Sequence, residues 1–185
     1  MIKMAIIGMG IMGKNHYRVL QGLDDVEIVG LCDVACEDNF SHTLYRDVDE
    51  LLKLDMDACI IATPTVLHTS IALKCLAKKI HLLIEKPVAS TLKCANEILQ
   101  AQQKSGAKVV IGHVERFNPV ILALKQELIG KEMYSINIER VGPFPPRIGD
   151  VGVLSDLAVH DIDLIRYITG QNIQKTNIFK NKHFF

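Results

Sequence analysis

Lys86, Asp156 and His160 have the types and the sequence context that acid–base chemistry on a hydroxyl group requires. Lys86 precedes Pro87, whose ring restricts the preceding residue to extended conformations, so an ammonium group could be held beside a reacting oxygen and assist its deprotonation. Asp156 and His160 are four residues apart, which places both side chains on one face of a helix, and the imidazole could act as a general base. Taken singly, a surface lysine in a turn and a hydrogen-bonded structural histidine are the commoner explanations.

Three glycines near the start of the chain have the spacing of a phosphate-binding turn. An apolar run over residues 2–7 ends in Gly8, Gly10 and Gly13, and a helix-compatible segment follows at residues 14–20. Gly8 would permit a sharp turn, Gly10 would let a pyrophosphate approach the backbone, and Gly13 would let the helix pack closely. The N–H groups at the start of the helix would then face the anion. The order strand, glycine turn and helix is the context that a dinucleotide-binding fingerprint needs.

An acidic residue supports this interpretation. Residues 26–32 are predicted to form the next strand, and Asp33 follows it, about 20 residues after the last glycine, where a ribose-binding acid is expected. A carboxylate there accepts hydrogen bonds from the ribose hydroxyls and repels a 2′-phosphate, so we expect NAD as cofactor rather than NADP. The alternative is an ordinary βαβ turn with a solvated aspartate.

Composition excludes several other classes of protein. The chain has 185 residues, with 21 Lys and Arg against 21 Asp and Glu, so no basic excess points to nucleic acid. The sequence contains no run of 18 apolar residues, so no membrane span is predicted. The five cysteines are odd in number and form no CxxC pair, which favours reduced, buried thiols and a cytoplasmic location. The sequence contains neither an HExxH motif nor the Cys/His spacing of a zinc site, so no metal site is predicted.

Strands and helices alternate along most of the chain, which predicts a parallel sheet. Further strands are expected at residues 57–62, 80–84 and 108–112, and ligands bind beyond the carboxyl ends of such strands. We therefore expect one crevice to bring together the segments at these ends, namely the glycine turn, Asp33, Thr63-Pro64, Glu85-Lys86 and residues 113–119. In the last segment Arg116 and Asn118 could contact cofactor or substrate, or be a solvated arginine beside a helix-capping asparagine.

The pattern changes after residue 130. Residues 133–141 alternate as a half-exposed strand does, and residues 155–168 are predicted to be an amphipathic helix closed by Gly170. On this helix Asp163 and Arg166 are expected to form a surface pair. The predicted fold class is α/β, with a Rossmann-type parallel sheet in residues 1–119, followed in residues 120–185 by the beginning of an incomplete α+β substrate domain.

A family resemblance connects these features. The motifs occur in the order GxGxxG, Ala62-Thr63-Pro64 with His68, Glu85-Lys86-Pro87, residues 112–119, and DxxxH at 156–160. Over about residues 1–170 the chain resembles the glucose–fructose oxidoreductase/inositol dehydrogenase (Gfo/Idh/MocA) family. The resemblance implies a Rossmann domain, a C-terminal domain built on a large, mostly antiparallel sheet, and homo-oligomers. It implies oxidation or reduction of sugar and cyclitol hydroxyls with a nicotinamide, with Lys86, Asp156 and His160 as the catalytic set.

Pattern and resemblance together give a list of expected site residues. Arg116 and Asn118 are expected to bind substrate. The cofactor-binding residues are expected to be Gly8, Gly10, Ile11, Met12, Gly13, Asp33, Thr63, Pro64, His68, Glu85 and Lys86. Residues 113–119 and 141–147 resemble the UDP-N-acetylglucosamine 3-dehydrogenases most, which implies hydride transfer from C3 of a UDP-N-acetylhexosamine.

The chain departs from the family pattern in two places. The segment between Asp33 and Asp57 is short, so the second crossover helix is expected to be reduced or missing. The sequence also stops soon after the DxxxH motif, so most of the C-terminal sheet is expected to be absent and turnover to suffer more than NAD binding. The alternative function is a non-catalytic dinucleotide-binding or interaction module.

Overall fold

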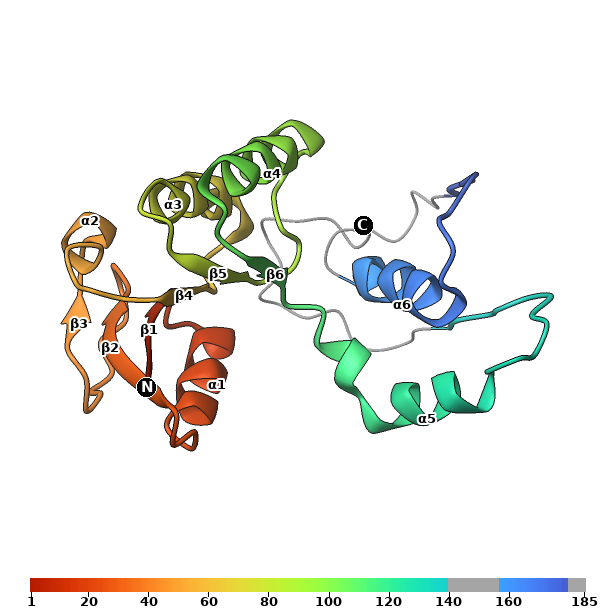
Figure 1. Ribbon diagram of the computed structural model, residues 1–185, viewed down its shortest axis with the longest axis horizontal. Coiled ribbons are helices and arrows are strands. Elements are labelled where there is room, and N and C mark those ends of the chain that lie inside the picture. The colour runs from red at the N-terminus through yellow and green to blue at the C-terminus, as the bar shows by residue number, and fades with distance from the viewer. Residues whose placement is uncertain (140–156, 180–185) are drawn as a thin grey trace.

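A six-stranded parallel sheet forms the centre of the computed structural model, which describes residues 1–139 and 157–179 (Figure 1). The strands lie in the order β3-β2-β1-β4-β5-β6, which is the order of a doubly wound dinucleotide-binding sheet. Their bounds are β1 Ile2–Ile7, β2 Val26–Cys32, β3 Leu44–Tyr45, β4 Ala58–Ile61, β5 His81–Ile84 and β6 Val109–Ile111. The predicted α/β fold with a Rossmann-type sheet is confirmed.

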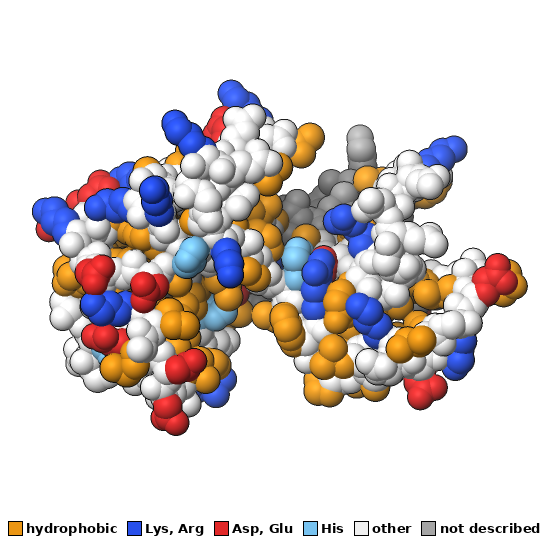
Figure 2. All heavy atoms as spheres, in the orientation of Figure 1, with side chains coloured by type: hydrophobic (Ala, Val, Ile, Leu, Met, Phe, Trp, Pro, Cys, Tyr) orange, Lys and Arg blue, Asp and Glu red, His pale blue; other side chains and the backbone are white. Residues whose placement is uncertain are grey.

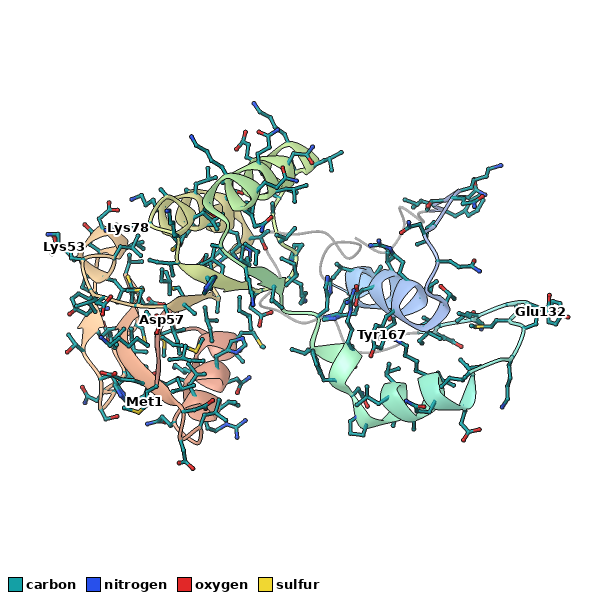
Figure 3. All side chains as sticks on the ribbon, viewed as in Figure 1. Met1, Lys53, Asp57, Lys78, Glu132 and Tyr167 are labelled. Carbon is teal, nitrogen blue, oxygen red and sulfur yellow. The ribbon has the colours of Figure 1, made fainter. Side chains whose placement is uncertain are left out.

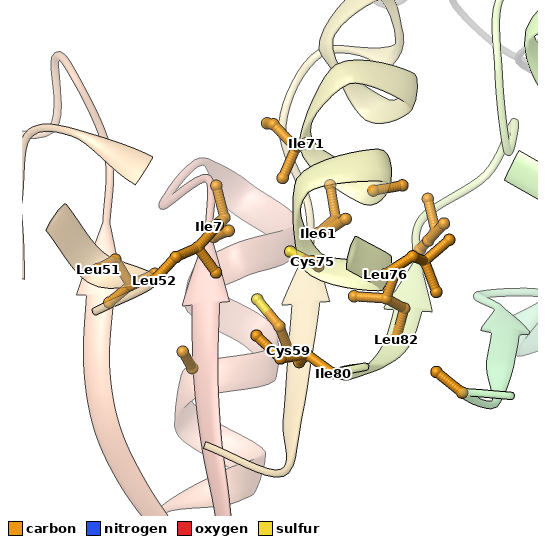
Figure 4. Packing of buried hydrophobic residues seen from close by; sticks show 14 of the residues in the cluster. Ile7, Leu51, Leu52, Cys59, Ile61, Ile71, Cys75, Leu76, Ile80 and Leu82 are labelled. Atoms are coloured by element: carbon orange, nitrogen blue, oxygen red, sulfur yellow. The ribbon is translucent and has the colours of Figure 1, made fainter. Parts of the chain in front are cut away.

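Helices cover both faces of the sheet, because neighbouring residues of a strand point to opposite sides. Ile6 packs with Tyr17 and Leu20 of α1 on one face, whereas Ile7 packs with α2, α3 and α4 on the other (Figure 4). Both residues are 0–1% exposed, so β1 is buried on both sides. The helices are α1 Ile11–Leu20, α2 Val48–Leu51, α3 Thr65–Ala77, α4 Leu92–Ser105, η1 Val114–Phe117 (a 3₁₀ helix), α5 Pro119–Glu127 and α6 Val159–Thr169.

Local sequence signals fix several helix ends. The Thr91 hydroxyl accepts a hydrogen bond from Cys94 N (3.2 Å) at the start of α4, and Gly106 ends that helix in the left-handed conformation that glycine favours (φ 72°). At α5, the Asn118 side chain accepts from Val120 N (3.0 Å) before a proline in the first turn. This is the helix-capping role that was one of the two alternatives for Asn118.

The connection between β2 and β3 contains no helix. Residues 33–43 form an irregular segment, and Phe40 packs edge-on against Tyr17 of α1, with ring centroids 5.2 Å apart. Phe40 and Cys36 of this segment pack on the cluster formed by α1 and the sheet, where a crossover helix would otherwise pack. The expectation that this helix is reduced or missing is confirmed.

The strand expected at residues 133–141 is wrong for the part that the structure describes. Residues 133–139 have no strand structure, and Tyr134 is 88% exposed. An alternating pattern becomes a strand only when a neighbouring strand supplies hydrogen-bond partners, and within residues 1–139 and 157–179 these residues join no sheet.

A second lobe, made of η1, α5 and α6, lies beyond the β6 edge of the sheet (Figure 1). Its packing is sparse, since α5 has no buried residue and hydrophobic side chains are visible on its surface (Figure 2). The proposed boundary between residues 119 and 120 would fall inside the first turn of α5 and stays a prediction. Among the described helices, none combines the length and apolar character needed to cross a bilayer.

Candidate cofactor and active site

The glycine turn is closed tightly on one side and open on the other. Gly8 has φ 93°, and a Cβ there would lie 2.6 Å from the backbone of Ala62 and Thr63 at the end of β4. A Cβ on Gly13 would lie 1.8 Å from the Gly8 carbonyl oxygen. A Cβ on Gly10, in contrast, would meet nothing within 4 Å. Gly8 and Gly13 are therefore required by the fold, while Gly10 leaves free space where a ligand could approach the backbone.

The start of α1 has the electrostatic character of an anion site. The helix begins at Ile11, has no side-chain cap and carries no acidic residue in its first turn. The first N–H groups of a helix have no partner within the helix, and the helix dipole adds partial positive charge there. Next to this turn, the Thr63 hydroxyl is buried and has no hydrogen-bond partner among the described residues. Free space, unpaired donors and a buried hydroxyl without a partner fit the pyrophosphate of a dinucleotide.

Asp33 connects the glycine turn to the end of β2. Its Oδ2 accepts a hydrogen bond from Met9 N (2.7 Å), and its Oδ1 accepts from Ala35 N and Cys36 N (2.8 Å each). Burial alone would raise the pKa of Asp33, but the three backbone donors and Arg46 outweigh it, so the pKa lies below its usual value. Since a carboxylate oxygen has two lone pairs, Oδ2 can still accept a ribose hydroxyl.

Glu85 and His16 join α1 to the carboxyl end of β5. Glu85 is 6% exposed, and its Oε1 lies 2.7 Å from Nε2 of His16. A Cβ on Gly112, just after β6, would come 3.0 Å from the Glu85 carboxylate, so glycine leaves the space that this side chain fills. Lys86 follows and is joined to Pro87 by a cis peptide bond. Sequence pattern assigns His16 no role, because only the fold brings α1 close to the end of β5.

His68 is directed at main-chain groups. It is 1% exposed, with Nε2 2.9 Å from the Thr63 carbonyl oxygen and Nδ1 3.0 Å from that of Pro87. The imidazole thus lies between the segments that follow β4 and β5. Any contribution of His68 to cofactor binding therefore comes through the positions of these two segments.

Arg116 and Asp163 form a two-pronged ion pair between η1 and α6. Arg116 Nε donates to Asp163 Oδ2 (2.7 Å) and Nη2 donates to Oδ1 (2.5 Å). The expected pair of Asp163 with Arg166 is wrong, because Arg166 points to Asn172 (2.9 Å). Burial would raise the pKa of Asp163. The hydrogen bonds from Arg116 and the electrostatic effect of the nearby His113 outweigh burial, so the pKa lies below its usual value.

His113 lies beside this ion pair. Its Nε2 is 3.7 Å from Asp163 Oδ1, and its Nδ1 is buried without a hydrogen-bond partner among the described residues. Burial lowers the pKa of His113, and Asp163 opposes the shift only in part. The neutral imidazole is therefore the favoured form near neutral pH.

The expected catalytic residues come from neighbouring elements. Lys86 follows β5, which pairs with β6, and η1 follows β6 and packs on α6, which carries His160. Histidine side chains are visible between the two lobes (Figure 2). Asp156 lies outside the described residues. Among those residues, no group of three or more His, Cys, Asp or Glu could hold a metal ion.

A parallel sheet in this order, with an open glycine turn and an acid at the end of β2, defines a dinucleotide-binding Rossmann domain. Residues 2–113 match the family described as oxidoreductases with an NAD-binding Rossmann fold. The chain belongs to this family, Gfo/Idh/MocA, as the resemblance of its motifs implied.

Individual relatives extend the match beyond residue 113. The chain is 33% identical over 175 residues to a UDP-N-acetylglucosamine 3-dehydrogenase of Acidithiobacillus ferrooxidans, covering 91% of this chain and 55% of that protein. It is 32% identical over 191 residues to an inositol 2-dehydrogenase of Arthrobacter sp., covering 96% and 57%. The chain thus spans little more than half the length of these curated relatives.

A solved structure agrees in fold. The WlbA dehydrogenase of Chromobacterium violaceum, crystallised with NADH and UDP-GlcNAcA, is similar with a TM-score of 0.81 and 22% identity. The match covers 90% of this chain and 55% of that one.

Proposed function

We propose that this chain forms the cofactor-binding half of an NAD-dependent oxidoreductase that acts on a hydroxyl group of a sugar-type substrate. The observation that carries the proposal is the arrangement at the glycine turn. Gly10 faces free space, α1 begins without a cap, and Asp33 is held in place by three backbone N–H groups. This arrangement suits a pyrophosphate and an unphosphorylated ribose on one ligand.

The same proposal gives roles to the residues around the substrate. His160 takes the proton of the hydroxyl group, and Lys86 donates a hydrogen bond to its oxygen as negative charge develops there. Asp156, which lies outside the described residues, holds the substrate, as the family resemblance implies. Bound NAD would supply the hydride acceptor. His16, Glu85 and His68 keep the carboxyl ends of β4 and β5 in place against α1.

For the substrate, we propose C3 of a UDP-N-acetylhexosamine. The relatives at 33% and 32% identity are named for a UDP-sugar and for inositol, so overall similarity does not choose between them. The sequences of residues 113–119 and 141–147 resemble those of the UDP-sugar enzymes, which supports this choice. We place the protein in the cytoplasm, since its five cysteines are free thiols that suit a reducing compartment. For a full-length protein of this family we propose assembly into homo-oligomers.

A binding titration and a substrate panel test the proposal. Calorimetry on the 185-residue chain should show that NAD binds. NADH formation should then be followed with NAD and UDP-N-acetylglucosamine, UDP-glucose or myo-inositol in turn. Turnover with UDP-N-acetylglucosamine supports the full proposal, and turnover with inositol alone replaces its substrate. NAD binding without turnover on any of the three favours the non-catalytic module, and no NAD binding contradicts the proposal altogether.

A further inference from the structure

The ion pair between Arg116 and Asp163 bridges two segments that are 47 residues apart in the chain. Arg116 lies in η1, directly after β6 at the edge of the sheet, and Asp163 lies in the middle of α6. Both contacts use parallel N–H groups of one guanidinium, 2.7 and 2.5 Å from the two carboxylate oxygens. Such a fork fixes the direction as well as the distance between two groups. The pair therefore defines how α6 is oriented relative to the sheet.

Aromatic and apolar contacts accompany this ion pair on α6. Asp163 and Leu164 are its buried residues, and most of its other residues are half-buried. The ring of Tyr167, on the side of α6 toward α5 (Figure 3), lies 5.3 Å from the Arg116 guanidinium carbon. Lys125 of α5 lies 3.7 Å from the same ring centroid. Arg116 thus contacts two residues of α6, Asp163 through the ion pair and Tyr167 through its ring.

His160 is carried by the element that this ion pair holds. It lies three residues before Asp163 on α6, and side chains at that spacing are neighbours on a helix surface. A displacement of about 1 Å of a catalytic group can cost about 100-fold in rate. An interaction that fixes α6 therefore also fixes the proposed general base.

We infer that Arg116 and Asp163 are positioning residues. They hold α6, which carries His160, at a fixed position relative to the strand end that carries Lys86. The inference rests on the proposed function for its catalytic consequence. It assigns Arg116 a different role from the substrate contact expected from the sequence. The side chain of Arg116 is 39% exposed and that of Asp163 is 7% exposed, so two N–H groups of Arg116 are committed to a largely buried carboxylate.

Hydrogen exchange measured on the 185-residue chain tests the positioning without any need for turnover. Asp163→Asn and Arg116→Gln each remove one side of the ion pair, and the double variant removes both. Residues of one pair behave non-additively, so each single variant should speed amide exchange in residues 157–169, and the double variant should add little. Arg166→Gln is the matched control, since it removes an arginine of the same helix that bonds Asn172 instead, and it should leave exchange near that of wild type.

Unchanged exchange in Asp163→Asn overturns the inference, as does full additivity in the double variant. In the wild-type chain, absence of turnover on any substrate counts against the proposed function alone, because the exchange measurement still decides the positioning role. NAD affinity gives a second check. It should stay within about twofold of wild type in both single variants, since the glycine turn and Asp33 do not touch the pair.

Kinetics distinguish a positioning role from a substrate-binding role of Arg116. With an active substrate, both single variants should lower kcat by about tenfold or more and change KM little, as expected when a catalytic group is misplaced. Arg116→Lys keeps the charge but loses the fork, so its kcat should fall between wild type and Arg116→Gln. A rise in KM for Arg116→Gln alone, with Asp163→Asn near wild type, overturns the inference and makes Arg116 a substrate ligand.

Discussion

The imidazole of His16 on α1 lies 2.7 Å from the Glu85 carboxylate at the end of β5. This contact joins the helix that follows the glycine turn to the residue that precedes Lys86. It is partly buried, with side-chain exposures of 18% for His16 and 7% for Glu85. The helix after the cofactor turn and the strand end that precedes the proposed catalytic lysine are thus held together by a side-chain contact.

Lys86 and His160 are expected to act on turnover and not on cofactor affinity. In a form of the protein that turns over, Lys86→Ala and His160→Ala should each reduce kcat by about 100-fold or more, because a hydrogen-bond donor or a general base is lost. Calorimetry should find NAD binding largely retained. Lys93→Ala on the exposed face of α4 is a matched lysine control, and near-normal turnover in either site variant would contradict that residue's role.

Replacement by alanine should reduce stability much more at Gly13 than at Gly10. A Cβ at Gly13 would overlap the Gly8 carbonyl, so Gly13→Ala should lower the free energy of unfolding by about 1–3 kcal/mol or more. Gly10 has open space around it and φ −70°, so Gly10→Ala should change stability by less than about 0.5 kcal/mol. Urea titration measures both values.

The same Gly10→Ala variant tests where the pyrophosphate lies. If the phosphates approach the backbone at Gly10, the added methyl should weaken NAD binding by about tenfold or more. Calorimetry on a variant that is shown to be folded makes the comparison clean. Unchanged affinity would mean that the ligand does not pass over this residue.

Asp33 should set the preference for NAD over NADP. Its pKa is lowered, so its carboxylate stays charged through neutral and mildly acidic pH and opposes a 2′-phosphate. Asp33→Asn removes the charge and should narrow the ratio of the two dissociation constants by about tenfold. The ratio is the useful quantity, because any disturbance of the backbone hydrogen bonds affects both cofactors alike. Tighter binding of NADP by the wild-type chain would contradict the role of Asp33.

His113 should make stability depend on pH below neutrality. Burial lowers its pKa in the folded protein, so the unfolded chain takes up a proton first as pH falls through about 6.5. Stability should therefore decrease from about pH 7 downward, until the pH passes the folded pKa. In His113→Gln, urea midpoints measured from about pH 7 to 5 should fall less steeply than in wild type. Equal slopes would show that His113 does not contribute. Asp163 affects stability only at lower pH, since its pKa is lowered from an already acidic value.

The sequence by itself determined the Rossmann domain and several helix ends. The glycine spacing, Asp33 after an apolar run and caps such as Thr91 and Asn118 act over a few residues. Their consequences follow from backbone geometry, whatever the rest of the chain does. The alternation of strands and helices also left few possible connections, since parallel crossovers are right-handed. For these reasons a parallel sheet could be predicted without knowing any contact between distant residues, whereas the order of its strands came only from the structure.

Only the tertiary structure decided which distant side chains meet. Asp163 binds Arg116 and not its neighbour Arg166, because packing of α6 on η1 brings a better-placed guanidinium to it from 47 residues away. Residues 133–139 did not become a strand, because alternation alone supplies no neighbouring strand. The two ring nitrogens of His68 lie 3.0 and 2.9 Å from carbonyl oxygens of two separate segments. In each case the deciding energy lies in a partner that is far away in sequence, which local pattern cannot specify.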